Sequence, residues 1–131
     1  MKRILALLLV LTTVFACSVA YAGTWKQDAK GWWYSEKNGS YPASTWKKIN
    51  KKWYYFNADG YMATGWLTLS GKTYYLNSKG VMQTGWQQIG GSWYYFNSSG
   101  EMVTNSYIGD YYLGSDGKWV QAGTTSPTTT K

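Results

Sequence analysis

Residues 65–84 of this chain read GWLTLSGKTYYLNSKGVMQT. The segments on either side, 46–64 and 85–104, carry the same pattern at a spacing of twenty residues. Five kinds of residue stay in register through the three segments: Trp46, Trp66 and Trp86; Tyr54, Tyr74 and Tyr94; Asn57, Asn77 and Asn97; Gly60, Gly80 and Gly100; Met62, Met82 and Met102. A unit this short cannot bury its apolar face alone, so the period predicts an architecture of stacked repeats.

Each unit has the composition of a strand, a turn and a second strand. Residues 52–57 are rich in Trp, Tyr and Phe, which suit a half-buried pleated surface. Residues 57–60 form a turn cluster whose glycine is free to adopt a positive φ. We expect residues 61–64 to return as a short strand. Because side chains alternate along a strand, one face can build the core while the other lines grooves between hairpins.

The two ends of the chain differ from the repeats in composition. Residues 1–22 contain Lys2 and Arg3, an apolar run and a final Ala-Tyr-Ala, a pattern typical of a cleaved signal peptide. Cys17 raises the alternative of lipidation, although Phe15 fits that processing site poorly. The apolar run is too short to span a membrane. Residues 122–131 form a Thr-rich tail that we expect to be disordered, which leaves residues 23–121 as the repeat domain, with about five units.

The first and last units depart from the pattern, as the capping units of a solenoid do. Trp25 and Trp32 keep the seven-residue spacing of later tryptophan pairs, but Tyr41-Pro42 stands at the methionine position. At the other end, Asn105-Ser106 replaces Gly-Trp, and Trp119 occupies the methionine position. Leu, Ile and Val are sparse after the signal segment, whereas all nine tryptophans lie there. We therefore expect stacked Trp and Tyr side chains to form the core.

The residue inventory argues against catalysis. The chain contains no histidine, its single cysteine is at position 17, and Asp and Glu together number six. Two carboxylates suffice for glycoside hydrolysis, so the inventory alone does not exclude an enzyme. Asp59, however, aligns with Lys79 and Ser99 in the sister units, and its place before a turn glycine suits a hydrogen-bonding role in the turn. We predict no enzyme, no metal and no cofactor.

The charge balance is modestly basic. Without residues 1–22, eleven lysines face six carboxylates, which gives a net charge of about +5. Such a charge could favour an anionic cell-wall polymer, but ordinary solubility explains it equally well. The one lysine cluster, Lys47, Lys48, Lys51 and Lys52, is expected on a solvated face of a hairpin.

The aromatic rings are the strongest chemical signal. Two tryptophans seven residues apart, with a tyrosine of the next unit, could wall a cage for a quaternary ammonium, which donates no hydrogen bond but is attracted to ring faces. Each ring contact contributes about 0.5–1 kcal/mol when exposed and about 2 kcal/mol when dry, so three rings predict a millimolar to high-micromolar site. The same rings could instead stack on sugar faces, or serve packing alone.

These units resemble the choline-binding, or cell-wall-binding, repeats of Gram-positive surface proteins and cell-wall hydrolases. The resemblance covers residues 24–121, and its carriers are Gly65-Trp66, Gly85-Trp86, Trp53-Tyr54-Tyr55-Phe56, Trp93-Tyr94-Tyr95-Phe96 and the Gly-x-Met-x-Thr stretches at 60–64, 80–84 and 100–104. Related glucan-binding repeats and toxin repeats that bind host glycans share much of this pattern. The resemblance implies an all-β fold, a solenoid of stacked β-hairpin repeats wound as a superhelix, with ligand sites between successive hairpins.

The resemblance also implies which rings form these sites: the Trp of Gly-Trp, the Trp before Tyr-Tyr, and a Tyr of the following hairpin. Carried over to this chain, the sites are Trp46, Trp53 and Tyr74; Trp86, Trp93 and Tyr111; and, at the front, Trp25, Trp32 and Tyr54. A middle site would use Trp66 and Tyr94, but Thr73 stands where its second tryptophan belongs. Either tyrosine of each pair could face the site, with the methionines nearby.

We therefore predict a non-catalytic module, secreted and associated with the cell wall, that binds choline or phosphocholine groups of teichoic acid. One alternative is the binding of glucan or a host glycan by ring stacking. Another is a structural spacer whose rings serve the core alone. We expect no nucleic-acid partner and no membrane span.

Overall fold

The computed structural model describes residues 23–121, which form strands and turns without a helix. Ten strands pair into five antiparallel hairpins, and each hairpin is a separate two-stranded sheet. The strands are β1 (Thr24–Asp28), β2 (Gly31–Ser35), β3 (Thr45–Ile49), β4 (Lys52–Phe56), β5 (Gly65–Leu69), β6 (Lys72–Leu76), β7 (Gly85–Ile89), β8 (Ser92–Phe96), β9 (Ser106–Ile108) and β10 (Tyr111–Leu113). The all-β prediction is confirmed. The predicted signal peptide, 1–22, and the predicted tail, 122–131, lie outside the described residues.

The hairpins pair different segments from those predicted. The strand that begins with Gly-Trp pairs with the strand that carries Tyr-Tyr, so β5 runs against β6 from Gly65 opposite Leu76 to Leu69 opposite Lys72. Two-residue loops connect these strands, and both residues have positive φ at Asn50-Lys51, Ser70-Gly71 and Gly90-Gly91. This is the type I′ geometry, whose twist matches that of the paired strands. The segment predicted as a return strand, 61–64, does fold back on β4, where Met62 lies opposite Phe56, but it makes only isolated bridges and is not a strand.

The Asn-x-x-Gly segments are turns, as predicted, and they carry the chain back to the preceding hairpin. The Oδ1 atom of Asn57 accepts the backbone N–H groups of Asp59 and Tyr61, both at 3.0 Å. Asn77 and Asn97 make the same pair of hydrogen bonds. The hydrogen-bonding role in the turn that was expected of the Asp59 carboxylate is therefore played by the side-chain amide oxygen of Asn57. In the last unit, where glycine replaces this asparagine, Asp116 Oδ1 accepts the Lys118 N–H at 3.0 Å.

A close contact between units fixes their spacing. The side chain of Met62 lies directly over Gly80, where a Cβ atom would overlap its sulfur. Gly80 also has a φ of +77°, a conformation that glycine adopts without steric cost. The same contact recurs between Met82 and Gly100 and between Met102 and Gly117, while Tyr41 takes the place of methionine over Gly60.

The core is a column of side chains, one from each of the last four units. Phe56, Leu76, Phe96 and Leu113 follow the Tyr-Tyr pairs and are completely buried. The expected core of stacked Trp and Tyr is correct only in part, since Tyr34 and Tyr94 are buried but several tryptophans are not. A two-stranded hairpin has one inward face to bury, so most indoles lie along the grooves between hairpins and keep an exposed surface.

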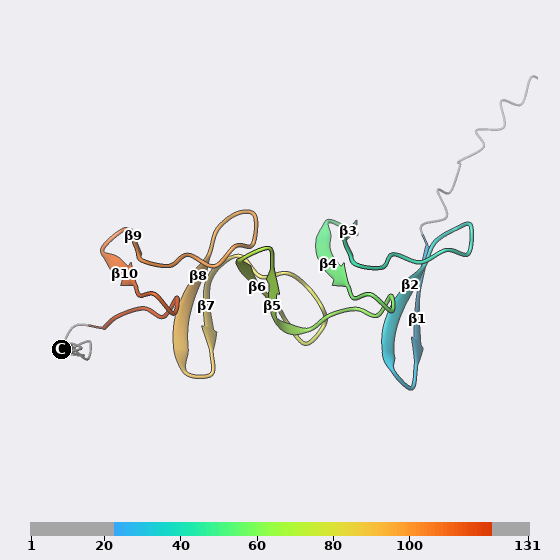
Figure 1. Cartoon of the computed structure of the whole chain (residues 1–131), viewed down its shortest axis with the longest axis horizontal. Coiled ribbons are helices and arrows are strands. Elements are labelled where there is room, and N and C mark those ends of the chain that lie inside the picture. Colours follow the sequence, from blue (N-terminus) through green and yellow to red (C-terminus); the bar gives the residue numbers. More distant parts are fainter. Residues whose placement is uncertain (1–22, 122–131) are drawn as a thin grey trace, which may run out of the picture.

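The hairpins follow one another along a rod and wind about its long axis (Figure 1). Hairpins β1–β2 and β7–β8, which are three units apart, project to the same side, while β3–β4 and β9–β10 project to the opposite side. This winding agrees with the superhelix implied by the resemblance. Grooves between successive hairpins therefore face different directions around the rod.

Candidate ligand-binding site

The tryptophans of the Gly-Trp strands lie between two tyrosines. Trp46 pairs with Tyr55 across its own hairpin, and their rings meet edge to face with centroids 5.2 Å apart. Tyr74, of the next hairpin, contacts the same indole at 5.0 Å. Trp86 is held likewise by Tyr95 at 5.3 Å and Tyr111 at 5.5 Å. Edge-to-face pairs of this kind are favourable beyond their buried area, so the indoles are held in place before any ligand arrives.

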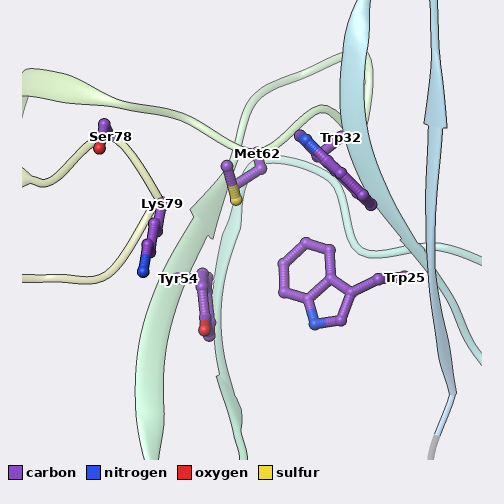
Figure 2. A pocket seen from close by; sticks show the side chains of 6 residues that line it. All are labelled: Trp25, Trp32, Tyr54, Met62, Ser78 and Lys79. Atoms are coloured by element: carbon purple, nitrogen blue, oxygen red, sulfur yellow. The ribbon is translucent and has the colours of Figure 1, made fainter.

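Three pockets occur between successive hairpins, each with two tryptophans, a tyrosine of the next hairpin and the residue at the methionine position. The first pocket is Trp25, Trp32, Tyr54 and Met62; the second is Trp46, Trp53, Tyr74 and Met82; the third is Trp86, Trp93, Tyr111 and Trp119. Their volumes are about 310, 400 and 300 Å³. Figure 2 shows the first pocket, with the two tryptophans on one side and Tyr54 and Met62 facing them.

Backbone hydrogen bonds join walls that come from different hairpins. The N–H of Met62 donates to the carbonyl of Trp32 at 2.7 Å, and that of Met82 donates to the carbonyl of Trp53 at 2.9 Å. In the third pocket, the N–H of Trp119 donates to the carbonyl of Trp93 at 2.8 Å. Each pocket therefore has its second tryptophan and its fourth wall fixed by the main chain, independently of side-chain packing.

The polar and charged lining residues differ between the pockets. Ser78 and Lys79 line the first pocket, and Ser98, Ser99 and Glu101 line the second, whereas the third is lined by rings alone. Glu101 accepts a hydrogen bond from Lys72 Nζ at 3.0 Å. That hydrogen bond and the carboxylate charge raise the pKa of Lys72.

The groove at Trp66 lacks one ring. Trp66 contacts Tyr75 at 5.1 Å and Tyr94 at 4.9 Å, as the equivalent indoles do elsewhere. Thr73 occupies the place of the second tryptophan, and its hydroxyl lies 3.4 Å from that of Thr68. This groove therefore offers two rings instead of three.

The predicted triplets each gather around one pocket, and the first tyrosine of each pair (Tyr54, Tyr74 and Tyr111) faces the pocket. Trp119 was not predicted as a lining residue, although its place two residues after Gly117 matches that of Met82 after Gly80. The predicted replacement of Gly-Trp by Asn105-Ser106 is wrong by one position. In the short last hairpin Tyr107 pairs with Tyr112, as Trp86 pairs with Tyr95.

A further pocket of about 230 Å³ lies in the first half of the rod among Trp33, Tyr41 and Tyr61, with Asp28 and Asp59 in its lining. The Tyr61 hydroxyl donates to Asp28 Oδ2 at 2.9 Å. Hydrogen bonds from the Lys30 N–H and from this hydroxyl lower the pKa of Asp28. Within residues 23–121 no three potential metal ligands cluster, and no helix there is long and apolar enough to cross a membrane.

The fold and the pockets define a solenoid of β-hairpins with aromatic cavities between its units. A family model described as a choline-binding repeat matches residues 43–83, 63–107 and 83–121, which together are more than half of the chain. The chain belongs to the choline-binding repeat family.

Relatives of known structure have the same architecture. Choline-binding protein F from Streptococcus pneumoniae is 40% identical with a TM-score of 0.72, over 76% of this chain and 34% of that one. The pneumococcal cell-wall endolysin from phage Cp-1, solved with choline, is 47% identical with a TM-score of 0.64, over 76% of this chain and 31% of that one. The choline-binding domain of Spr1274 from Streptococcus pneumoniae is 48% identical with a TM-score of 0.58, over 61% of this chain and 98% of that one.

Two curated relatives, the lysozymes of Streptococcus phages Cp-1 and Cp-9, are enzymes, but the match covers little of either. A stretch of 28 residues is 64% identical to the lysozyme of Streptococcus phage Cp-1, and it covers 21% of this chain and 8% of the lysozyme. The chain spans about a third of choline-binding protein F and of the endolysin, and less than a tenth of this lysozyme.

Proposed function

We propose that the repeats bind choline or phosphocholine groups of cell-wall teichoic acid and so attach the protein to the wall. The observation that carries this proposal is the three preformed pockets, each with two tryptophans and a tyrosine. A trimethylammonium group is attracted to ring faces and needs no hydrogen-bond partner, which suits walls of this composition. The endolysin solved with choline and the choline-binding domain of Spr1274 support the choice of ligand.

Weak individual pockets are sufficient for this role. A ligand cation in one pocket contacts three rings that are partly exposed to water, which corresponds to millimolar to high-micromolar affinity. A polymer that carries many choline groups can engage a second pocket of the same rod, and that step is effectively intramolecular. Attachment to the polymer is then much tighter than the binding of free choline.

We further infer that the module is non-catalytic, secreted and associated with the cell wall. Glycoside hydrolysis needs two carboxylates beside the scissile bond. In the three aromatic pockets the only lining carboxylate is Glu101, and Lys72 is paired with it. The signal-peptide pattern of residues 1–22 supports secretion.

Intrinsic tryptophan fluorescence of the purified protein, titrated with choline, tests the proposal, and a short dextran is the parallel titration. We expect a saturable change at millimolar choline and no change with dextran, because the pockets present ring faces to an ammonium. A response to dextran alone would place the protein among glycan-binding modules. No response to either ligand would favour the structural spacer.

A further inference from the structure

The three pockets share their rings but differ in the charge at their rims. Lys79 lines the first pocket, and it comes from the turn two hairpins beyond the one that supplies Trp25 and Trp32. In the second pocket the equivalent residue is Ser99, and Glu101 adds a carboxylate. The third pocket is lined by rings alone. The first rim is therefore cationic, while the second carries an anion.

Lys79 lies at the rim of the first pocket. Figure 2 shows Lys79 and Ser78 on the other side of Tyr54 and Met62 from the two tryptophans, so they border the pocket without closing it. The Lys79 side chain is exposed, and within residues 23–121 neither salt bridge involves it. No carboxylate of the described protein neutralises this ammonium at the pocket rim.

A lysine at the rim of a cation-binding cage weakens the binding of choline, whose only charge is positive, because like charges repel across a few ångströms. Phosphocholine changes this balance, since its phosphate follows the ammonium after two carbons and an oxygen. With the ammonium between the rings, the phosphate extends toward the rim. There the lysine can form a charge-assisted hydrogen bond with a phosphate oxygen. Glu101 at the second rim repels the same phosphate, although Lys72 at 3.0 Å offsets part of its charge.

We infer that the first pocket is a phosphocholine site in which Lys79 pairs with the phosphate, whereas the second pocket binds choline at least as well as phosphocholine. This inference rests on the proposed function, since the rings must first hold the ammonium. It makes Lys79 the residue that determines which form of the ligand the first pocket prefers. The pockets of one rod then differ in the part of the wall polymer that they recognise.

The sister turns provide reciprocal variants for the test. Lys79→Ser gives the first pocket the residue of the second, and Ser99→Lys gives the second pocket the residue of the first. Lys37→Ser is the control, because it removes one positive charge from a turn that lines none of the three aromatic pockets. The indole N–H resonances of Trp32 and Trp53, each assigned from its Phe variant, report the first and second pockets separately by NMR.

Each protein is titrated with choline and with phosphocholine. At Trp32 we expect phosphocholine to bind roughly fivefold more tightly than choline, the effect of one unit charge at about 4 Å in water. Lys79→Ser should abolish this preference, Lys37→Ser should retain it, and Ser99→Lys should create it at Trp53. Raising the salt concentration should weaken the preference, because exposed charges are screened.

The outcomes separate the two proposals. The role of Lys79 is overturned, while choline binding stands, if the preference for phosphocholine over choline at Trp32 is the same in Lys79→Ser as in the wild type. It is also overturned if Lys37→Ser loses this preference as completely as Lys79→Ser does. If neither resonance moves with either ligand, the proposed function itself fails. Co-sedimentation with choline-bearing wall polymer but not with phosphatidylcholine vesicles would assign the phosphocholine to the wall, and the reverse result would assign it to lipid.

Discussion

Single residues set how closely neighbouring units approach. Gly80 and Gly71 share a φ of +77°, so alanine at either position incurs a backbone cost of about 1–2 kcal/mol. Only at Gly80 would the added Cβ also overlap Met62, since nothing lies within 4 Å of the corresponding point at Gly71. We expect Gly80→Ala to lower the free energy of unfolding by about 1–3 kcal/mol more than Gly71→Ala does. Urea unfolding measures both losses, and equal losses would contradict the role given to the Met62 contact.

Asp28 links a single side chain to the pH dependence of stability. Hydrogen bonds from the Lys30 N–H and the Tyr61 hydroxyl lower its pKa below the ordinary value of an aspartate side chain. A carboxyl group whose pKa is lower in the folded state stabilises that state above the unfolded pKa, and this contribution is lost as the pH falls through the folded value. We expect Tyr61→Phe to raise the pKa of Asp28, because one of the hydrogen bonds that lower it is lost. The variant should be less stable than the wild type at neutral pH, and the difference in the free energy of unfolding between the two proteins should become smaller in acid. Carboxyl NMR titration measures the pKa, with Tyr107→Phe as the control, and an unchanged value would refute the assignment.

At the scale of the hairpin, the twenty-residue period predicts the repeat, but it does not decide whether the Tyr-Tyr strand pairs with the segment before it or with the segment after it. The segments before and after it are both short and half apolar. Gly90-Gly91 and Ser70-Gly71 are two-residue signals for a type I′ turn, and they select the segment before it. The segment after an asparagine turn folds back on the Tyr-Tyr strand only as a single bridge, at Met82 opposite Leu76. The Met82 N–H donates instead to the Trp53 carbonyl of the preceding hairpin, at 2.9 Å.

The pocket triplets could be read from the sequence because the rings repeat in register and resemble a known family. Two lining or pairing positions could not be read in this way. Trp119 stands at the position where every full repeat has a methionine. Its place in the repeat therefore matches a lining residue, but its residue type does not match the pattern from which the triplets were predicted. Tyr107 pairs with Tyr112 in a hairpin whose strands have only three residues each. Because this hairpin is shorter than the others, its residues align with those of the full repeats one position later than the twenty-residue period predicts.

Two matched tryptophans test the pockets as elements of the rod. Trp86 and Trp66 each contact a tyrosine of the next hairpin, at 5.5 and 4.9 Å, so alanine at either should disturb packing to a similar extent. Only Trp86 belongs to a pocket with a second tryptophan. We expect Trp86→Ala to weaken choline binding at its pocket by about three- to thirtyfold, the contribution of one ring, and Trp66→Ala to have much less effect. Calorimetric titration compares them, and equal losses would count against the cage assignment.

The whole molecule is a linear array, so ligand and stability are coupled along it. Choline that binds only the folded rod should raise the melting temperature, with about 2.7 kcal/mol of stabilisation from one site at a hundredfold excess over its Kd. Because each repeat contacts mainly its neighbours, this stabilisation should be strongest in the units that border an occupied pocket. Amide hydrogen exchange with and without choline locates it. All five hairpins of the wild type border one of the three pockets, so the comparison uses a variant with Trp46→Ala and Trp86→Ala, in which only the first pocket is complete. Protection spread evenly over all five of its hairpins would contradict nearest-neighbour coupling.

Attachment to a polymer is a property of the whole rod, because it depends on several pockets that face different directions. A variant with Trp46→Ala and Trp86→Ala keeps only the first pocket complete. Its first pocket should bind free phosphocholine as the wild type does, since none of its lining residues changes. Retention on choline-bearing wall polymer should nevertheless fall by about a hundredfold or more, because no second engagement within the rod remains to raise the effective concentration. Sedimentation with the polymer measures retention, and a drop of only about threefold, in proportion to the number of pockets, would show that they act independently.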